Sequence, residues 1–440
     1  MTDQHIDRYL LNACERGDIT QEALTRHVLR HLQGSCETCR RELAVWRKER
    51  NPRRHAKPLL QTLLQERVSD PEESQKAERD FLTLFPLTPS QRQRKIARAR
   101  TRFRSPWLAR LLVEEAIEEF RSDLDEASAL IEAAFQVLDR APFSHFKDEV
   151  QILTRAALAS THKSRGHLAR AERFFIELRD IAQMHGLVDL SLAAQVDELE
   201  GNFWRDRRHL DQSRRLLLRA IKLYRLLGDK TRRARALLIL GGTHFYAGDS
   251  PRAIAVAREA FELDTGRETF RAMAGHNLAL YLVESGNLEE GVRCFQDNVP
   301  RYRKVRDSWR LCDLYFHWLA GKIHRSLGQL DTAERHLLQA RDGFAERGTA
   351  YDAILVCLDL GLVYDGQERY DELETLAEHT IHGLTSESLH REAHAALVLF
   401  AKAARRRIMS HDLARRIAHF LQFSFHNPEL RCEIQLPEAD

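Results

Sequence analysis

Cysteine is sparse in this chain of 440 residues, and its seven cysteines are an odd number that cannot form a closed set of disulfides. Cys294, Cys312, Cys357 and Cys432 stand singly, and we expect them to be small buried hydrophobic side chains. No run of 18 apolar residues occurs, so we expect no transmembrane helix. The first residues also lack the basic and apolar pattern of a signal peptide. These absences predict a protein of the reducing cytoplasm that has no contact with membranes.

Sequence motifs of known catalytic chemistry are missing as well. There is no glycine-rich phosphate-binding loop, no His-Glu-x-x-His metalloprotease motif and no nucleophile elbow. An enzyme would need a reactive centre, and no arrangement of residues in the sequence indicates one. We therefore expect a protein that is not an enzyme.

An excess of one charge sign is absent from the whole chain, whose net charge is only +3, but the two parts of the chain differ. Residues 1–104 carry 22 Lys and Arg against 14 Asp and Glu, whereas the remainder carries 46 against 51. This asymmetry indicates that the N-terminal quarter and the rest of the chain meet different partners.

The chain does contain a repeat with a period of about 40 residues, which is typical of a stacked helical array. A turn of the form Gly-x-Leu-x-x-Ala recurs between stretches with helical apolar periodicity. The intervals between turns range from 38 to 44 residues. The turns begin at Ser122, Gly166, Arg208, Gly248, Gly286, Gly328 and Glu368.

Small residues recur at fixed places in the two helices of each repeat. They should let helices cross closely, because positions three or four residues apart share one helix face. Seven positions before each turn stand Ala159, Gly201, Gly241, Ala279, Gly321 and Gly361. Five and twelve positions after the turns stand Ala171, Ala253 and Ala333, and then Ala220, Ala260 and Ala340.

These residues resemble the tetratricopeptide repeat, although the units are longer than the 34 residues of that family. The resemblance implies an all-α fold in which about seven helix hairpins span residues 105–427, followed by an irregular tail at 428–440. It also implies a groove that binds a protein or peptide partner. Most aromatic and basic residues near the ends of the first helices should belong to the core, and only a minority should face a groove. This group comprises Trp204, Arg205, His244, Tyr246, Tyr281, Trp318 and His324.

The N-terminal segment contains residues with metal-ligand spacing. His31, Cys36 and Cys39 lie in a predicted helix–turn–helix, and thiolates with imidazole suit the tetrahedral coordination of Zn²⁺. A fourth ligand from the first helix would complete the site, with His5 and Cys14 as the two candidates. Oxidation of the cysteines would expel the metal, so the site is either structural or redox-sensing.

Residues 1–46 resemble the zinc-binding anti-sigma domain, in which a His or Cys in the first helix precedes a His and a Cys-x-x-Cys pair. The resemblance favours His5 over Cys14 and implies a sigma factor as one partner. The sequence departs from the family by one extra residue between His31 and Cys36, and no transmembrane helix follows. We therefore predict a small helical zinc domain over residues 1–50.

Residues 51–104 read as a basic helical linker. Its cations could neutralise the phosphates of a nucleic acid, and Arg92, Arg94, Lys95, Arg98 and Arg100 are the candidates for this contact. No recognition helix of a known type accompanies them.

The pattern as a whole predicts a cytoplasmic adaptor that binds a protein partner in bacterial transcriptional or stress signalling. The alternative is a nucleic-acid-binding regulator that uses the basic linker.

Overall fold

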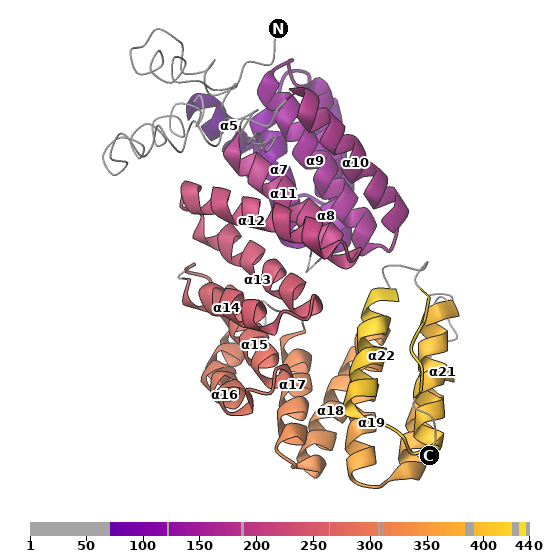
Figure 1. Cartoon of the computed structure of the whole chain (residues 1–440). Helices are drawn as coiled ribbons and strands as arrows, with labels where there is room; N and C mark the ends of the chain where they lie inside the picture. Colours follow the sequence, from indigo (N-terminus) through magenta and orange to yellow (C-terminus); the bar gives the residue numbers. More distant parts are fainter. Residues whose placement is uncertain are drawn as a thin grey trace, which may run out of the picture. The chain divides into compact units, whose positions relative to one another are not determined.

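The computed structural model describes residues 71–120, 123–185, 189–263, 265–306, 309, 311–382, 391–424 and 431–436. These residues form helices joined by turns and contain no strand, and Figure 1 follows them from α5 to α22. The helices are α5 (Pro71–Leu84), α6 (Pro89–Arg98), α7 (Pro106–Glu119), α8 (Leu124–Arg140), α9 (His145–Ser164), α10 (Leu168–His185), α11 (Leu190–Asp206), α12 (Leu210–Leu227), α13 (Lys230–Tyr246), α14 (Ser250–Glu262), α15 (Glu268–Glu284), α16 (Leu288–Val305), α17 (Cys312–Ser326), α18 (Leu330–Glu346), α19 (Ala350–Gly366), α20 (Tyr370–His382), α21 (Arg391–Arg405) and α22 (His411–Ser424).

The predicted helix hairpins are confirmed. Each odd-numbered helix from α7 to α19 is the first helix of a hairpin, and the next helix is the second, which gives seven hairpins in the described chain. The predicted turn starts lie between these helices, and six of them adopt a left-handed backbone with positive φ. These are Gly166, Arg208, Gly248, Gly286, Gly328 and Glu368. The seventh, Ser122, lies outside the described residues.

The turn at Gly248 illustrates why the helices end and begin where they do. Its φ of 73° closes α13, and its N–H donates to the Phe245 carbonyl at 3.0 Å. Such a left-handed residue is the common way to satisfy the last carbonyls of a helix, and glycine adopts it without strain. Asp249 then accepts a hydrogen bond from the N–H of Arg252 at 3.2 Å and so caps the start of α14.

The small residues lie where the two helices of a hairpin meet, as the repeat predicts. A Cβ added to Gly321 would lie 2.5 Å from Cγ of Leu337, and one added to Gly201 would lie 2.9 Å from Cγ of Leu217. Both leucines are fully buried on the second helices α18 and α12. The absence of a side chain on the first helix therefore makes room for a large one on the second.

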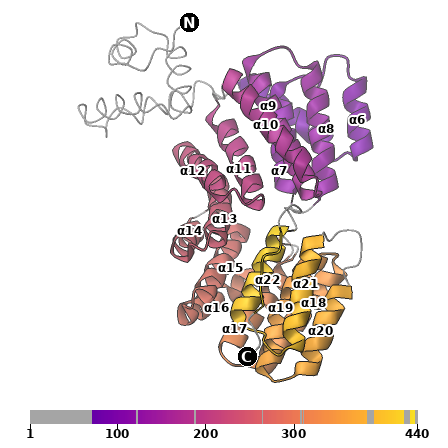
Figure 2. The same cartoon turned by 45° about the vertical axis from the view of Figure 1, so that its right-hand side comes forward.

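Residue contacts divide the chain into two units, Met1–Glu200 and Gly201–Asp440, each described by itself. Within the second unit the second helix of each hairpin contacts the first helix of the next, from α12 with α13 to α18 with α19. The first helices α13, α15, α17 and α19 also contact one another in turn. This stacking order, which can be followed in Figure 2, is that of a helical repeat array.

In the first unit, α5 packs against α7 and α6 packs against α8, although both helices fall in the sequence expected to form a linker. Arg92 is 1% exposed. Its guanidinium donates to the carbonyls of Leu84 and Leu87 and forms a 2.6 Å ion pair with Glu126. The assignment of Arg92 to a nucleic-acid surface was therefore wrong, because this side chain joins α5 to α8 inside the unit.

The last helices of the second unit are α21 and α22, which follow the seven hairpins. Leu413, Ile417 and Leu421 of α22 are buried, and this helix contacts α19 and α21. Residues 431–436 are irregular, as expected for the tail, and pack against this core through Cys432, Ile434 and Leu436.

Candidate functional site

The predicted zinc ligands His5, His31, Cys36 and Cys39, and the alternative ligand Cys14, lie outside the described residues. Where the structure describes the chain, no three His, Cys, Asp or Glu side chains gather in a way that could hold a metal ion. The zinc site stays a prediction from the sequence.

The four single cysteines are free thiols. Cys312 and Cys357 are buried, as expected, whereas Cys294 and Cys432 are half-buried. Burial raises the pKa of Cys294 and of Cys312 to about 11, so both thiols are protonated near neutral pH. Since the thiolate is the reactive form, neither side chain is suited to nucleophilic chemistry.

The first helices of the second unit gather polar side chains on one face. This face, called the inner face below, carries Arg205, Arg208, Tyr246, Tyr281, Glu284, Lys322 and Asp359. Arg208, in the first hairpin of the unit, forms a hydrogen bond with His419 of α22. The second unit therefore curves around the inner face.

Lys322 of α17 is the centre of an ion cluster that joins three hairpins. Its Nζ lies 2.9 Å from a carboxylate oxygen of Glu284 on α15 and 2.9 Å from one of Asp359 on α19. Trp318 donates a 2.7 Å hydrogen bond from Nε1 to Asp359. Burial opposes the charge on Lys322, but the two carboxylates outweigh it and raise the pKa of the lysine. In turn, the lysine lowers the pKa of Glu284, so Lys322 and Glu284 are both charged near neutral pH.

Arg205, Tyr246 and Tyr281 form a second polar group on the inner face. Arg205 forms a 2.7 Å ion pair with Asp206, and the charge of Asp206 holds the pKa of Arg205 above its usual value despite burial. Burial raises the pKa of both tyrosines, so their phenols are protonated hydrogen-bonding groups. The charge of Asp352 on α19 also raises the pKa of Tyr246.

Two histidines of α22 face the same region and extend it. His411 lies close enough to Arg325, Glu284, Lys322 and Asp359 for their charges to act on its pKa, which burial lowers. His419 lies two helical turns further along α22, with Nε2 3.1 Å from Nη2 of Arg208. The inner face thus offers charged groups, phenols and imidazoles, all of which can form hydrogen bonds with an extended chain.

The structure places the predicted aromatic and basic residues in three settings. Trp204, His244 and Tyr281 are at most 6% exposed, which agrees with the expected core role. Arg205, Tyr246 and Trp318 are half-buried at the inner face, whereas His324 stacks on His336 of α18. Five further residues of this region were not predicted from the sequence, namely Glu284, Lys322, Asp359, His411 and His419. Of these, only Lys322 could have been found from the sequence, since it directly follows Gly321, one of the small residues at which the two helices of a hairpin meet.

Four of the cations assigned to a nucleic-acid surface are exposed. Arg94, Lys95, Arg98 and Arg100 point to solvent from α6 and the residues after it, on the side opposite to buried Arg92 and Ile96. The described residues provide no ion pair for any of the four.

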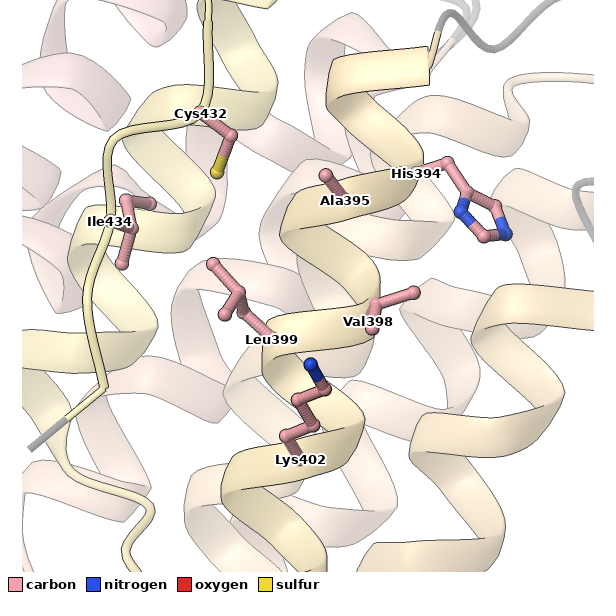
Figure 3. A pocket seen from close by; sticks show the side chains of 7 residues that line it. All are labelled: His394, Ala395, Val398, Leu399, Lys402, Cys432 and Ile434. Atoms are coloured by element: carbon pink, nitrogen blue, oxygen red, sulfur yellow. The ribbon is translucent and has the colours of Figure 1, made fainter. Parts of the chain in front are cut away.

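A shallow pocket of about 430 Å³ lies between α21 and the C-terminal segment (Figure 3). Its wall consists of α21 residues, among them Leu399 and Lys402, together with Cys432 and Ile434 of the C-terminal segment. Figure 3 shows the ring of His394 turned away from that segment. The lining lacks a convergent set of polar groups, and nothing in it points to a reaction.

Helices able to cross a membrane are not found among the described residues. No model of a known protein family matches the sequence, and no curated protein matches it.

Solved structures do match the fold. A Rap protein complexed with competence and sporulation factor is 13% identical with a TM-score of 0.56, and the match covers 72% of this chain and 88% of that one. A signal transduction ATPase with numerous domains and a tetratricopeptide repeat sensor, from Pyrococcus horikoshii, is 15% identical with a TM-score of 0.53, and the match covers 83% of this chain and 55% of that one. Aspartyl phosphate phosphatase F from Bacillus subtilis is 13% identical with a TM-score of 0.50, covering 85% of this chain and 98% of that one. At such identities the likeness concerns the fold alone, which is that of a tetratricopeptide-like helical array.

Proposed function

We propose that this chain is a non-enzymatic regulatory adaptor that binds a protein or peptide segment on the inner face of its second unit. The observation that carries the proposal is the convergence of buried and half-buried polar side chains from α11, α13, α15, α17 and α19 on one face. We place the protein in the cytoplasm, in bacterial transcriptional or stress signalling.

An extended segment is the partner that suits this face best. Stacked hairpins present groups at regular intervals along a face, and an extended peptide offers a backbone amide every few ångströms. The Rap protein with a similar fold was solved in complex with competence and sporulation factor, which is in keeping with a bound partner on this fold. One similar structure is named a phosphatase, so the fold by itself does not decide between adaptor and enzyme.

A library of random peptides displayed on phage tests the proposal with the full-length protein. We expect enriched peptides whose affinity falls at least tenfold, or about 1.4 kcal/mol, in Tyr246→Ala and Glu284→Gln. Glu346→Gln is the matched control, because Glu346 is exposed at the end of α18. Enriched peptides that bind all three variants equally would refute the inner face as the site.

We propose that residues 1–50 hold one zinc ion through His5, His31, Cys36 and Cys39, with a structural or redox-sensing role and a sigma factor as a candidate partner of this segment. The support is the ligand spacing in the sequence. Metal analysis of the purified protein should find one zinc per chain, which His31→Ala and Cys36→Ser each lose. Background zinc in the parent protein would remove the site.

A nucleic-acid-binding regulator is the second candidate, favoured by the exposed cations of α6. Arg94, Lys95, Arg98 and Arg100 could contact phosphates without breaking any ion pair in the described structure. Duplex DNA binding measured against salt should then follow a log–log slope of about −0.9 per phosphate contact. Replacing Arg94, Lys95 and Arg98 by glutamine should reduce that slope. The same substitution at Arg170 and Arg173 of α10 should leave it unchanged.

A further inference from the structure

The two ends of the second unit meet where Arg208 contacts His419. Nη2 of Arg208, between α11 and α12, lies 3.1 Å from Nε2 of His419 on α22, and 211 residues separate the two in sequence. In a repeat array each hairpin normally contacts only its neighbours. This contact stands outside the stacking order and couples hairpins that are not neighbours.

Arg208 is oriented by the end of α13. Its Nη1 donates to the carbonyl of Tyr246 at 3.4 Å, and its guanidinium lies 5.7 Å from the centre of the Tyr246 ring. Because arginine can only donate, Nε2 of His419 must accept with its lone pair. The bond therefore requires a neutral imidazole that carries its proton on Nδ1.

His419 belongs to the other end of the unit. The apolar side of α22 is buried through Leu413, Ile417 and Leu421, and the helix contacts α19 and α21. His419 therefore moves with the last hairpins, whereas Arg208 moves with the first. His419 itself is exposed, so the bond can break without opening the core.

We propose that the Arg208–His419 hydrogen bond is a clasp that holds the second unit in a closed form around its inner face. When the clasp breaks, the first and last hairpins move apart. A net hydrogen bond in water is weak, so its loss should change the ratio of open to closed forms only about two- to tenfold. A clasp of that strength lets both forms coexist and respond to a ligand or to pH.

Acid should open the clasp. Desolvation of the ring beside Arg208, together with the charges of Arg208 and Arg415, lowers the pKa of His419 to about 4, whereas a hydrogen bond to the Tyr246 carbonyl acts in the opposite sense. A histidine whose pKa is lowered in the closed form stabilises that form fully above the ordinary value near 6.5. Its contribution is lost as the pH falls from there towards 4, because the imidazolium can no longer accept from Arg208.

Distances between spin labels test the clasp in the full chain without any partner. Leu218 on α12 and Arg416 on α22 are exposed, and noncanonical residues at these positions carry the labels so that all seven cysteines remain. At pH 8 the parent protein should give a main short distance and a minor longer one. His419→Ala and Arg208→Ala should each raise the ratio of the longer to the shorter distance about two- to tenfold.

His419→Gln is the matched variant, because its amide oxygen can accept from Arg208 but does not titrate. It should keep the short distance as the main one at pH 8 and also at pH 5, where the parent protein shifts towards the longer one. Circular dichroism checks that every variant is folded. If His419→Ala is unfolded, the comparison of the parent protein with His419→Gln at pH 5 decides. Equal distance distributions at pH 8 in the parent protein and in folded His419→Ala and Arg208→Ala would overturn the clasp. Equal distributions at pH 5 in the parent protein and in His419→Gln would do so as well.

Discussion

Two of the hairpin turns place a residue other than glycine in the left-handed region. Glu368 has a φ of 57° and is exposed at the turn between α19 and α20, where Gly328 occupies the equivalent place one repeat earlier. A residue with a Cβ is strained there by about 1–2 kcal/mol. Glycine would relieve this strain. Part of the gain in stability would be lost, because glycine also makes the unfolded chain more flexible.

Glu368→Gly should therefore raise the free energy of unfolding by about 0.5–1 kcal/mol. Gly328→Ala should lower it by a similar or larger amount, since a Cβ there meets no atom within 4 Å and only the backbone is strained. Urea denaturation of both variants measures the two changes. Shifts of the same sign in both would contradict this account of the turns.

His276 provides a prediction of pH dependence. It is 7% exposed on α15, its Nδ1 lies 2.8 Å from the hydroxyl of Tyr302, and burial lowers its pKa to about 4. The unfolded chain then binds the proton more tightly than the folded protein. The contribution of His276 to stability is therefore complete above about pH 6.5 and is lost as the pH falls towards 4.

His276→Gln removes this titration and keeps a hydrogen-bonding side chain. The free energy of unfolding of the parent protein should fall from pH 7.5 to pH 5 by more than that of the variant, by about 1–2 kcal/mol at roughly 1.4 kcal/mol per pKa unit. Urea denaturation at both pH values gives the difference. Parallel losses in the two proteins would assign the effect to other groups.

At the scale of the helices, the seam between the two helices of a hairpin sets a strict limit on side-chain size. A Cβ on Gly321 would lie 2.5 Å from Leu337, whereas a Cβ on Gly241 would first meet Tyr281 at 3.5 Å. Gly321→Ala should thus lower stability by about 1–3 kcal/mol through overpacking. Gly241→Ala should be neutral or stabilising by up to about 1 kcal/mol, because alanine favours the helix. Thermal denaturation of both variants gives the comparison, and a loss of equal size in both would count against a seam limit specific to Gly321.

The hairpins could be predicted from the sequence because each depends on residues close together in the chain. Turn residues such as Gly248 act on their own backbone, and Gly321 meets Leu337 only 16 residues away. Glu284, Lys322 and Asp359 could not be predicted as a cluster, since their meeting depends on how three hairpins stack. The burial of Arg92 escaped prediction for the same reason, because its partner Glu126 belongs to another helix pair.

At the scale of the whole molecule, an array transmits a disturbance mainly to its neighbours. Gly321→Ala should therefore increase amide hydrogen exchange in α17 and α18, which carry the seam, and in the adjoining α16 and α19. The helices α7 to α9 of the first unit should exchange as in the parent protein. Hydrogen exchange followed by mass spectrometry resolves these segments, and an increase spread evenly over the chain would mean that it unfolds as one cooperative body.

The bond between Arg208 and His419 also bears on how many repeats the protein can have. Deleting or duplicating one 40-residue hairpin between α13 and α18 would preserve every remaining seam, because the units join in the same way. It would nevertheless move Arg208 away from His419, since each hairpin rotates and translates all the hairpins that follow it. The number of repeats is thus constrained by the contact between Arg208 and His419, and variants of this protein with a repeat gained or lost should also lack one of the two.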